Sequence, residues 1–164
     1  MRLPVPSAET TILSDQRGAV IVEGAVVFPV LFLIAFGVFE FSNLFYSHHI
    51  ITTGIHGAAR YLARLDNPAS AEDIARNLAV TGTTDGSGPR RVSWWDPSRV
   101  SVTVREVPNP LDPATGERRY RAASTVKVVE VRTEVTYAGL GNLPLLGIKP
   151  IAFSVSHTER VIGE

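Results

Sequence analysis

The sequence predicts an α+β protein in which a long N-terminal transmembrane α-helix is followed by a short helix and a small antiparallel β-sheet domain of about three strands. Three observations lead to this prediction. An almost uncharged apolar stretch fills residues 19–39, apolar residues then recur at helical spacing as far as Leu65, and strand-like segments occupy residues 99–161. The chain of 164 residues can form one membrane helix and one small domain of about 100 residues, but not two sizeable cores.

The apolar stretch is long enough to cross a membrane. From Ala19 to Phe39 there are 21 residues with a single ionisable group, Glu23, and about 20 apolar residues span the roughly 30 Å hydrocarbon core. A secretory signal peptide is the weaker interpretation, because its apolar core is usually only about 7–15 residues long. An uncleaved anchor stays open as an alternative. Both surviving interpretations place residues 19–41 in the membrane and the C-terminal part outside it.

Glu23 is the first candidate functional residue, because a carboxylate inside a membrane segment is costly and calls for a partner. Gly18 is a small residue beside Arg17 at the start of the apolar stretch, where a cytoplasmic peptidase could reach the chain. Cleavage between Gly18 and Ala19 would create an amine that Glu23 of a neighbouring subunit could neutralise. A plainer interpretation also stands: Glu23 lies about one turn into the helix, where an acid can reach the interface and is mildly favourable.

A succession of motifs marks the first third of the chain. It runs from RGAVIVE at residues 17–23, through an apolar run containing Pro29, to Glu40 and the pattern GAARYLAR at residues 57–64. Over about residues 17–65 this succession resembles the TadE-like family, the minor pseudopilins of tight-adherence (Flp-type) pilus systems. The resemblance implies cleavage after Gly18 by a prepilin peptidase, which makes Glu23 the fifth residue of the mature chain. The chain departs from the family in having Gly24, where a bulky residue usually follows the acid.

The resemblance also implies a function and a location. It describes a pilin-like membrane protein that takes part in assembly of a tight-adherence (Flp type IVb) pilus used for surface attachment. The implied partners are the prepilin peptidase, other pilins or pseudopilins, the pilus assembly machinery and membrane lipids. The protein would be a single-pass protein of the inner or cytoplasmic membrane, with a cytoplasmic leader at residues 1–18 and an extracytoplasmic C-terminal domain, or would reside in the pilus.

The helix is predicted to continue beyond the membrane over residues 42–66. Glu40 is the first charge after the apolar stretch, and aromatic residues suited to the interface follow it, which places the outer boundary here. Asp66-Asn67-Pro68 is predicted to end this helix. The domain then comprises residues 67–164. Ser70 is predicted to cap a short helix that ends near Val80, and residues 81–90, rich in Gly, Ser and Thr, are predicted to form a flexible linker.

Three strands are predicted in the domain. Residues 99–107 alternate strictly and place valines 100, 102 and 104 on one face. Residues 123–137 form a longer strand whose change of phase at Val128 and Val129 suits a β-bulge, and residues 151–161 form the third. The Gly- and Pro-broken apolar loop at residues 139–147 could cover the sheet edge or touch a partner. Packing over its own domain is the preferred interpretation.

Composition and residue patterns exclude several kinds of chemistry. Sixteen basic and sixteen acidic residues balance, which argues against a nucleic-acid partner, and the absence of cysteine excludes disulfides and thiolate chemistry. No catalytic residue, cofactor or metal site is predicted. The spacing of His49 and His56 is wrong for one metal ion, and Ser156, His157 and Glu159 lack a catalytic context.

Two alternatives to the pilin-like interpretation remain. The first is an uncleaved single-pass membrane-anchored binding module with an extracytoplasmic ligand-recognition domain, in which Trp94 or Trp95 lies on the contact surface. Adjacent residues on a strand face opposite ways, so one of these rings is expected in the core and the other at the surface. An anchored hydrolase ranks last.

Overall fold

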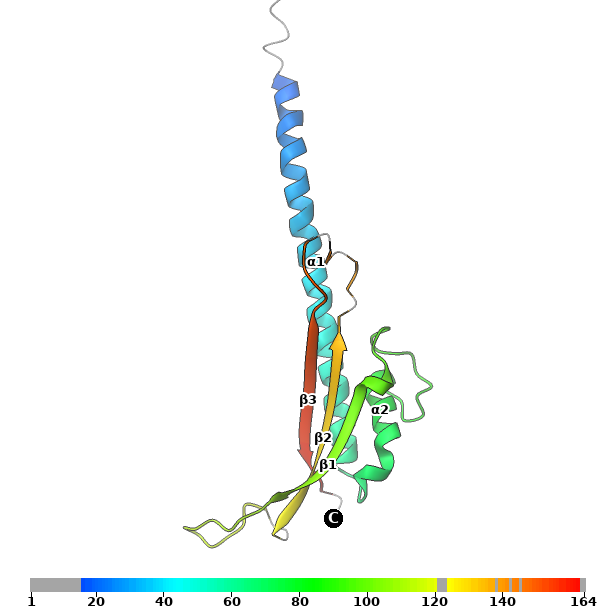
Figure 1. Ribbon diagram of the computed structural model, residues 1–164, viewed down its shortest axis with the longest axis vertical. Helices are drawn as coiled ribbons and strands as arrows, with labels where there is room; N and C mark the ends of the chain where they lie inside the picture. The colour runs from blue at the N-terminus through cyan, green and yellow to red at the C-terminus, as the bar shows by residue number, and fades with distance from the viewer. Residues whose placement is uncertain (1–15, 121–123, 138, 142, 145, 163–164) are drawn as a thin grey trace, which may run out of the picture.

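A computed structural model describes residues 16–120, 124–137, 139–141, 143–144 and 146–162. The order of elements is α1 (Gln16–Leu62), the 3-10 turn η1 (Pro68–Ala71), α2 (Glu72–Thr81), the 3-10 turn η2 (Pro97–Arg99), β1 (Val100–Pro108), β2 (Thr125–Thr136) and β3 (Ala152–Arg160). The predicted fold class is confirmed. Figure 1 shows α1 as a long rod whose first half stands free of the rest and whose second half carries the domain.

The sheet is a three-stranded antiparallel meander in the order β1-β2-β3. Its predicted alternation is confirmed in β1, where Val100 is buried, the two following alternate valines are half-buried and the residues between them are exposed. The predicted bulge in β2 is wrong. Both neighbouring strands pair with β2 in one unbroken register, so β2 has no bulge. The alternation of apolar residues along β2 shifts because Val126 is buried on one face of the sheet and Val129 on the other.

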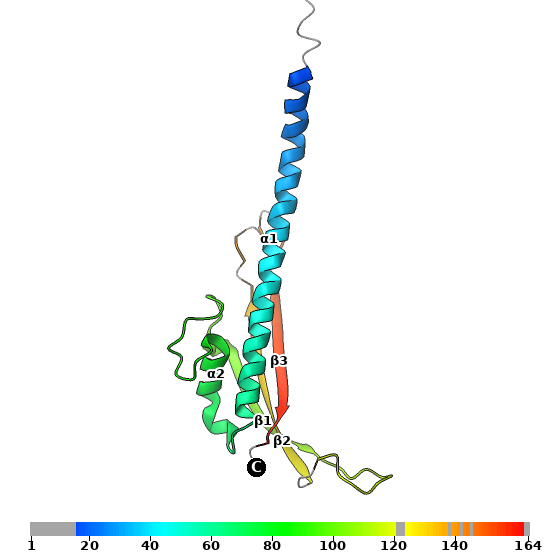
Figure 2. The same ribbon diagram turned by 180° about the vertical axis from the view of Figure 1, so that it is seen from behind.

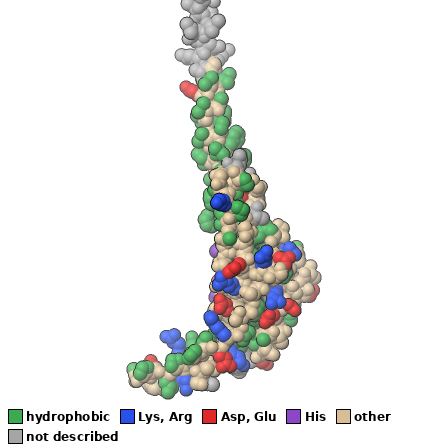
Figure 3. Space-filling model, viewed as in Figure 1, with side chains coloured by type: hydrophobic (Ala, Val, Ile, Leu, Met, Phe, Trp, Pro, Cys, Tyr) green, Lys and Arg blue, Asp and Glu red, His purple; other side chains and the backbone are tan. Residues whose placement is uncertain are grey.

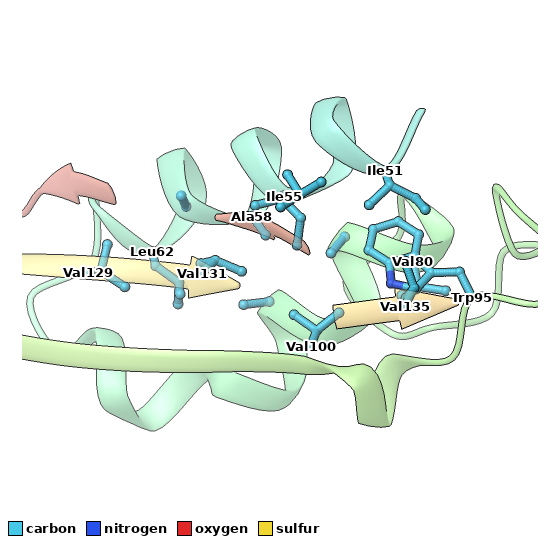
Figure 4. Packing of buried hydrophobic residues seen from close by; sticks show 14 of the residues in the cluster. Ile51, Ile55, Ala58, Leu62, Val80, Trp95, Val100, Val129, Val131 and Val135 are labelled. Atoms are coloured by element: carbon cyan, nitrogen blue, oxygen red, sulfur yellow. The ribbon is translucent and has the colours of Figure 1, made fainter. Parts of the chain in front are cut away.

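The core lies between the second half of α1, the sheet and α2, as Figures 2 and 4 show. The side of α1 that faces the sheet repeats every three or four residues, as an amphipathic helix requires. Its fully buried members meet buried valines of β2 and β1 and the ring of Trp95. On α1 these members are Ile51, Ile55, Ala58, Ala59 and Leu62.

Small residues let α2 approach α1 closely. A side-chain carbon added at Gly54 would lie 2.4 Å from the backbone oxygen of Ala79 and 3.0 Å from the ring of Trp95. Because a backbone oxygen in a packed helix cannot easily move, only glycine fits at this crossing. The tertiary packing of α1 therefore depends on a residue that the apolar pattern does not single out.

Two predicted element ends differ from the structure. α1 ends at Leu62, a few residues before the predicted stop, and tighter hydrogen bonds from Arg64 and Leu65 close its last turn. Ser70 does not cap α2, because η1 runs directly into α2 and the Ser70 hydroxyl instead donates to the backbone oxygen of Asn67.

The segment predicted as a linker begins with the C-cap of α2. Gly82 adopts a left-handed conformation, with φ of 82°, and donates its N–H to Leu78. Within the segment, Gly88 donates to the hydroxyl of Thr83, and beyond it Arg91 donates back to Val80. The segment thus turns and returns to the end of α2. Its flexibility stays a prediction.

Candidate assembly and processing site

The first half of α1 is apolar around its whole circumference. All its large hydrophobic residues from Val20 to Phe39 are exposed, and the most apolar part of the span Val20–Leu62 has no buried residue. Figure 3 shows hydrophobic side chains covering this part of the rod. A helix that is hydrophobic all round requires either a membrane or other helices around it. Its length and composition are sufficient for one membrane span.

Gly18 and Ala19, the predicted cleavage position, lie in the first turn of α1, which begins at Gln16. Gly18 is exposed, and a side-chain carbon added there would meet nothing within 4 Å. The bond after it is therefore not covered by the domain. Residues 1–15 of the predicted leader lie outside the described residues.

Glu23 lies on the exposed surface of α1. Within the described part of the chain, no side chain forms an ion pair or hydrogen bond with its carboxylate. It follows Ala19 by four residues, a rise of roughly 6 Å or about one turn. The carboxylate of Glu23 is therefore accessible to a partner other than the described side chains.

On the face of the free helix opposite to Glu23, three phenylalanine rings lie one after another along the axis. Rings of Phe28 and Phe32 lie 6.5 Å apart, and those of Phe32 and Phe36 lie 6.3 Å apart. Phe32 follows Glu23 by nine residues, which at about 100° per residue places it on the other side of the helix. Gly24 lies beneath the first of these rings: an added carbon there would be 3.2 Å from Phe28. The free helix thus has one face with a carboxylate and one lined with aromatic rings.

Glu40 is the residue whose environment the sequence did not reveal. It was expected to mark the outer boundary as the first charge, yet its side chain is completely buried. Its Oε1 accepts the backbone N–H of Leu140 at 2.9 Å, and its Oε2 has no partner among the described residues. The backbone oxygen of Glu40 also accepts the hydroxyl of Tyr137 at 3.2 Å. Glu40 therefore fastens the loop after β2 to the helix.

The loop after β2 requires glycine at this contact. Gly139 has φ of 72°, and a side-chain carbon there would lie 2.5 Å from Oε1 of Glu40. The loop packs against α1 of its own chain, where the sequence left open a sheet edge or a partner. The only sequence signal was a charge placed immediately after a long apolar run, and that signal is more typical of a membrane boundary.

Replacing Glu40 by glutamine is expected to stabilise the folded chain in detergent by about 1–2 kcal/mol, because the amide oxygen still accepts from Leu140 while the buried charge is removed. Denaturant unfolding of the full chain measures the effect. Glu40→Leu is the matched comparison, and it is expected to be less stable than Glu40→Gln because Leu140 N–H loses its acceptor. A less stable Glu40→Gln chain would contradict this account of the site.

Two histidines meet where α1 packs on β3. The rings of His56 and His157 have centroids 3.9 Å apart, and Nε2 of His157 lies 2.9 Å from Oε1 of Glu159. Burial lowers the pKa of His56, and the charges of His157 and Arg60 lower it further, while Glu159 opposes them. Among the residues that the structure describes, no group of three His, Asp or Glu side chains could hold a metal ion.

The lowered pKa of His56 predicts a loss of stability in acid. The unfolded chain binds a proton at about pH 6.5 more readily than the folded chain, so stability is full above that pH and falls as the pH drops below it. Thermal unfolding between about pH 7 and pH 5 should show a shallower decline for His56→Gln than for the parent chain. His49→Gln, at an exposed position of the same helix, is expected to keep the parent's decline. Equal declines for the parent and His56→Gln would contradict the prediction.

As expected, one of the two adjacent tryptophans lies in the core and the other nearer the surface, although they lie in a turn and not in a strand. Trp95 is fully buried, whereas Trp94 is half-buried and meets Tyr137 edge to face. Trp94 lines an open groove of about 520 Å³ between the turn and the ends of β2 and β3, together with Arg99, Glu134 and Phe153. This groove gives the alternative of a binding module a specific surface that includes Trp94.

Among the described residues, one helix is long and apolar enough to anchor the protein in a membrane, and the small sheet domain lies on the other end of that helix. Residues 18–60 match the family model described as TadE-like protein, so this part of the chain is similar to that family. The family is associated with pilus assembly. The match covers the helix from Gly18 to Arg60, and α2 and the sheet lie beyond it.

Neither a search of curated proteins nor a search of solved structures gave a match. The resemblance stated from the sequence is confirmed at the level of the family. The roles of Gly18, Ala19 and Glu23 stay predictions.

Proposed function

We propose that this chain is a pilin-like membrane protein that a prepilin peptidase cleaves between Gly18 and Ala19 and that then takes part in assembly of a tight-adherence pilus used for surface attachment. The main observation behind the proposal is the free half of α1, which is apolar on every side and has one carboxylate near its start, Glu23, that pairs with no described side chain. The family match over residues 18–60 supports it, because the match begins at Gly18.

The proposed location follows from the same helix. Residues 19–41 span the inner or cytoplasmic membrane before assembly, residues 1–18 are a cytoplasmic leader, and the domain at residues 67–164 is extracytoplasmic. Other pilins or pseudopilins replace the lipid around the helix when it leaves the bilayer. Such helices pack side by side, and Glu23 then meets the new amine at Ala19 of a neighbour, so that neither charge is left unpaired in an apolar interior.

Intact mass and N-terminal sequencing of the protein from its native membrane, with and without the peptidase, test the proposal. We expect a chain beginning at Ala19 when the peptidase is present and an uncleaved chain when it is absent. Gly18→Leu serves as the variant control, since its larger side chain occupies the position before the cleaved bond while the exposed site disturbs no packing. A chain that starts at Met1 in both samples would overturn the processing step.

The groove beside Trp94 favours one second candidate, an uncleaved membrane-anchored binding module. A half-buried aromatic ring beside Arg99 and Glu134 offers a stacking surface and both charges. Under this hypothesis Trp94→Ala abolishes recognition of an extracytoplasmic ligand while the chain keeps its N-terminus. Under the pilin-like proposal the same variant leaves cleavage after Gly18 unchanged.

A further inference from the structure

The loop between β2 and β3 lies beside α1 at the level where its free apolar half ends. Figures 1 and 2 both show it alongside the helix, beyond the ends of the two strands. Leu140 N–H binds Glu40, Tyr137 donates its hydroxyl to the backbone of Glu40, and Asn43 donates to that hydroxyl at 2.7 Å. These contacts, together with the fully buried side chain of Glu40, hold the start of the loop at one height on the helix.

The position of the loop along α1 coincides with the end of the apolar half of the helix. Glu40 comes directly after the exposed hydrophobic residues that end at Phe39. The 20 residues from Val20 to Phe39 rise about 30 Å, which matches the hydrocarbon core. Exposed aromatic rings of Phe41, Phe45 and Tyr46 occupy the same stretch of helix, as expected at a membrane surface. The loop therefore lies at the outer end of the proposed membrane helix, residues 19–41, where the hydrocarbon core that contains residues 20–39 gives way to the headgroups.

The composition of the loop suits a lipid surface. Between Gly139 and Ile151 the sequence contains no acid and one base, Lys149. Leu140 is 57 % exposed, and Pro144 and Lys149 are exposed as well. No described acidic side chain forms an ion pair with Lys149. A single exposed leucine is ordinary on a protein surface, so the position of this one beside the membrane boundary carries the argument.

We propose that the described part of this loop, residues 139–141, 143–144 and 146–149, rests on the outer surface of the membrane, with Leu140 at the boundary between headgroups and acyl chains and Lys149 at the lipid phosphates. This inference rests on the membrane placement in the proposed function. The helix alone leaves the domain free to tilt about the point where it leaves the bilayer. A second contact on one side of the helix fixes the orientation of the domain before the chain enters an assembly.

Site-specific labelling of the full chain tests the proposal, and the absence of cysteine gives a clean background. Leu140→Cys carries an environment-sensitive fluorophore in vesicles of mixed zwitterionic and anionic phospholipid. Leu111→Cys is the matched control, because Leu111 is 55 % exposed but lies on the distal hairpin between β1 and β2. Phe32→Cys, at an exposed position of the free helix, reports the bilayer interior.

A quencher attached to lipid near the headgroup is expected to quench the Leu140 label at least about threefold more than the Leu111 label. Pro144→Cys, a second exposed position of the loop, is expected to behave as Leu140 does. Equal quenching of the loop and Leu111 labels, with the Phe32 label quenched from within the bilayer, would overturn the loop contact and leave the membrane helix intact. A Phe32 label that no lipid quencher reaches would overturn the membrane placement and the loop contact together.

Discussion

Replacing Glu23 by alanine is expected to leave cleavage after Gly18 intact and to abolish assembly of the processed chain. The carboxylate is exposed on the free helix, and no described side chain of the same protein pairs with it. When helices pack side by side in an apolar environment, removing one member of a charge pair leaves the amine of Ala19 unpaired. Breaking a buried pair in this way costs about 3–5 kcal/mol, or a loss of roughly 100-fold or more in association.

The readouts are the N-terminus of the chain, its cross-linking to other pilins and the number of pili on cells. Glu117→Ala, an exposed acid on the distal hairpin, is the matched control and is expected to behave as the parent chain. Glu23→Asp keeps the charge on a shorter side chain and is expected to retain part of the assembly. Normal pili made with a cleaved Glu23→Ala chain would show that the carboxylate has no part in packing.

Trp95→Ala is expected to be the most destabilising single change in the domain, costing about 3–5 kcal/mol. Its ring is fully buried where α1, α2 and the sheet meet, and Figure 4 shows it beside Ile51, Val80 and Val135. The indole N–H donates to the hydroxyl of Thr133 at 3.1 Å, and that hydroxyl donates in turn to the backbone of Arg99. Alanine would leave a cavity and remove a buried hydrogen bond together.

Denaturant unfolding of the full chain in detergent, followed by near-UV circular dichroism, measures this loss. Trp94→Ala removes the same side chain from the neighbouring position, where the ring is half-buried, and is expected to cost about 1 kcal/mol through its edge contact with Tyr137. Trp95→Phe is expected to fall between the two, because it fills most of the space without the N–H. Similar losses for Trp94→Ala and Trp95→Ala would contradict the assignment of Trp95 to the core.

The pattern of the candidate site was visible before the fold was known, because it depends on neighbours along the chain. Glu23 follows Gly18 by five positions inside an apolar run, and the structure leaves that run uncovered. Glu40 is different: its partners Tyr137 and Leu140 lie about a hundred positions away in the sequence. No local pattern distinguishes a charge that ends a membrane span from one that is buried beneath a returning loop.

The sequence by itself determined the long helix and the strands, since hydrophobic periodicity and length act within one element, and its motifs over residues 18–60 gave the resemblance to the TadE-like family. Thus residues 19–39 read as a span, and β1 reads as a half-buried strand from its alternating valines. Tertiary structure alone decided that Trp95 and not Trp94 enters the core, that His56 meets His157, and that Glu40 holds a loop beside the helix. Each of these features depends on contacts between segments that are far apart in the sequence. Such contacts form only when the sheet packs against α1, because that packing decides which side chains touch.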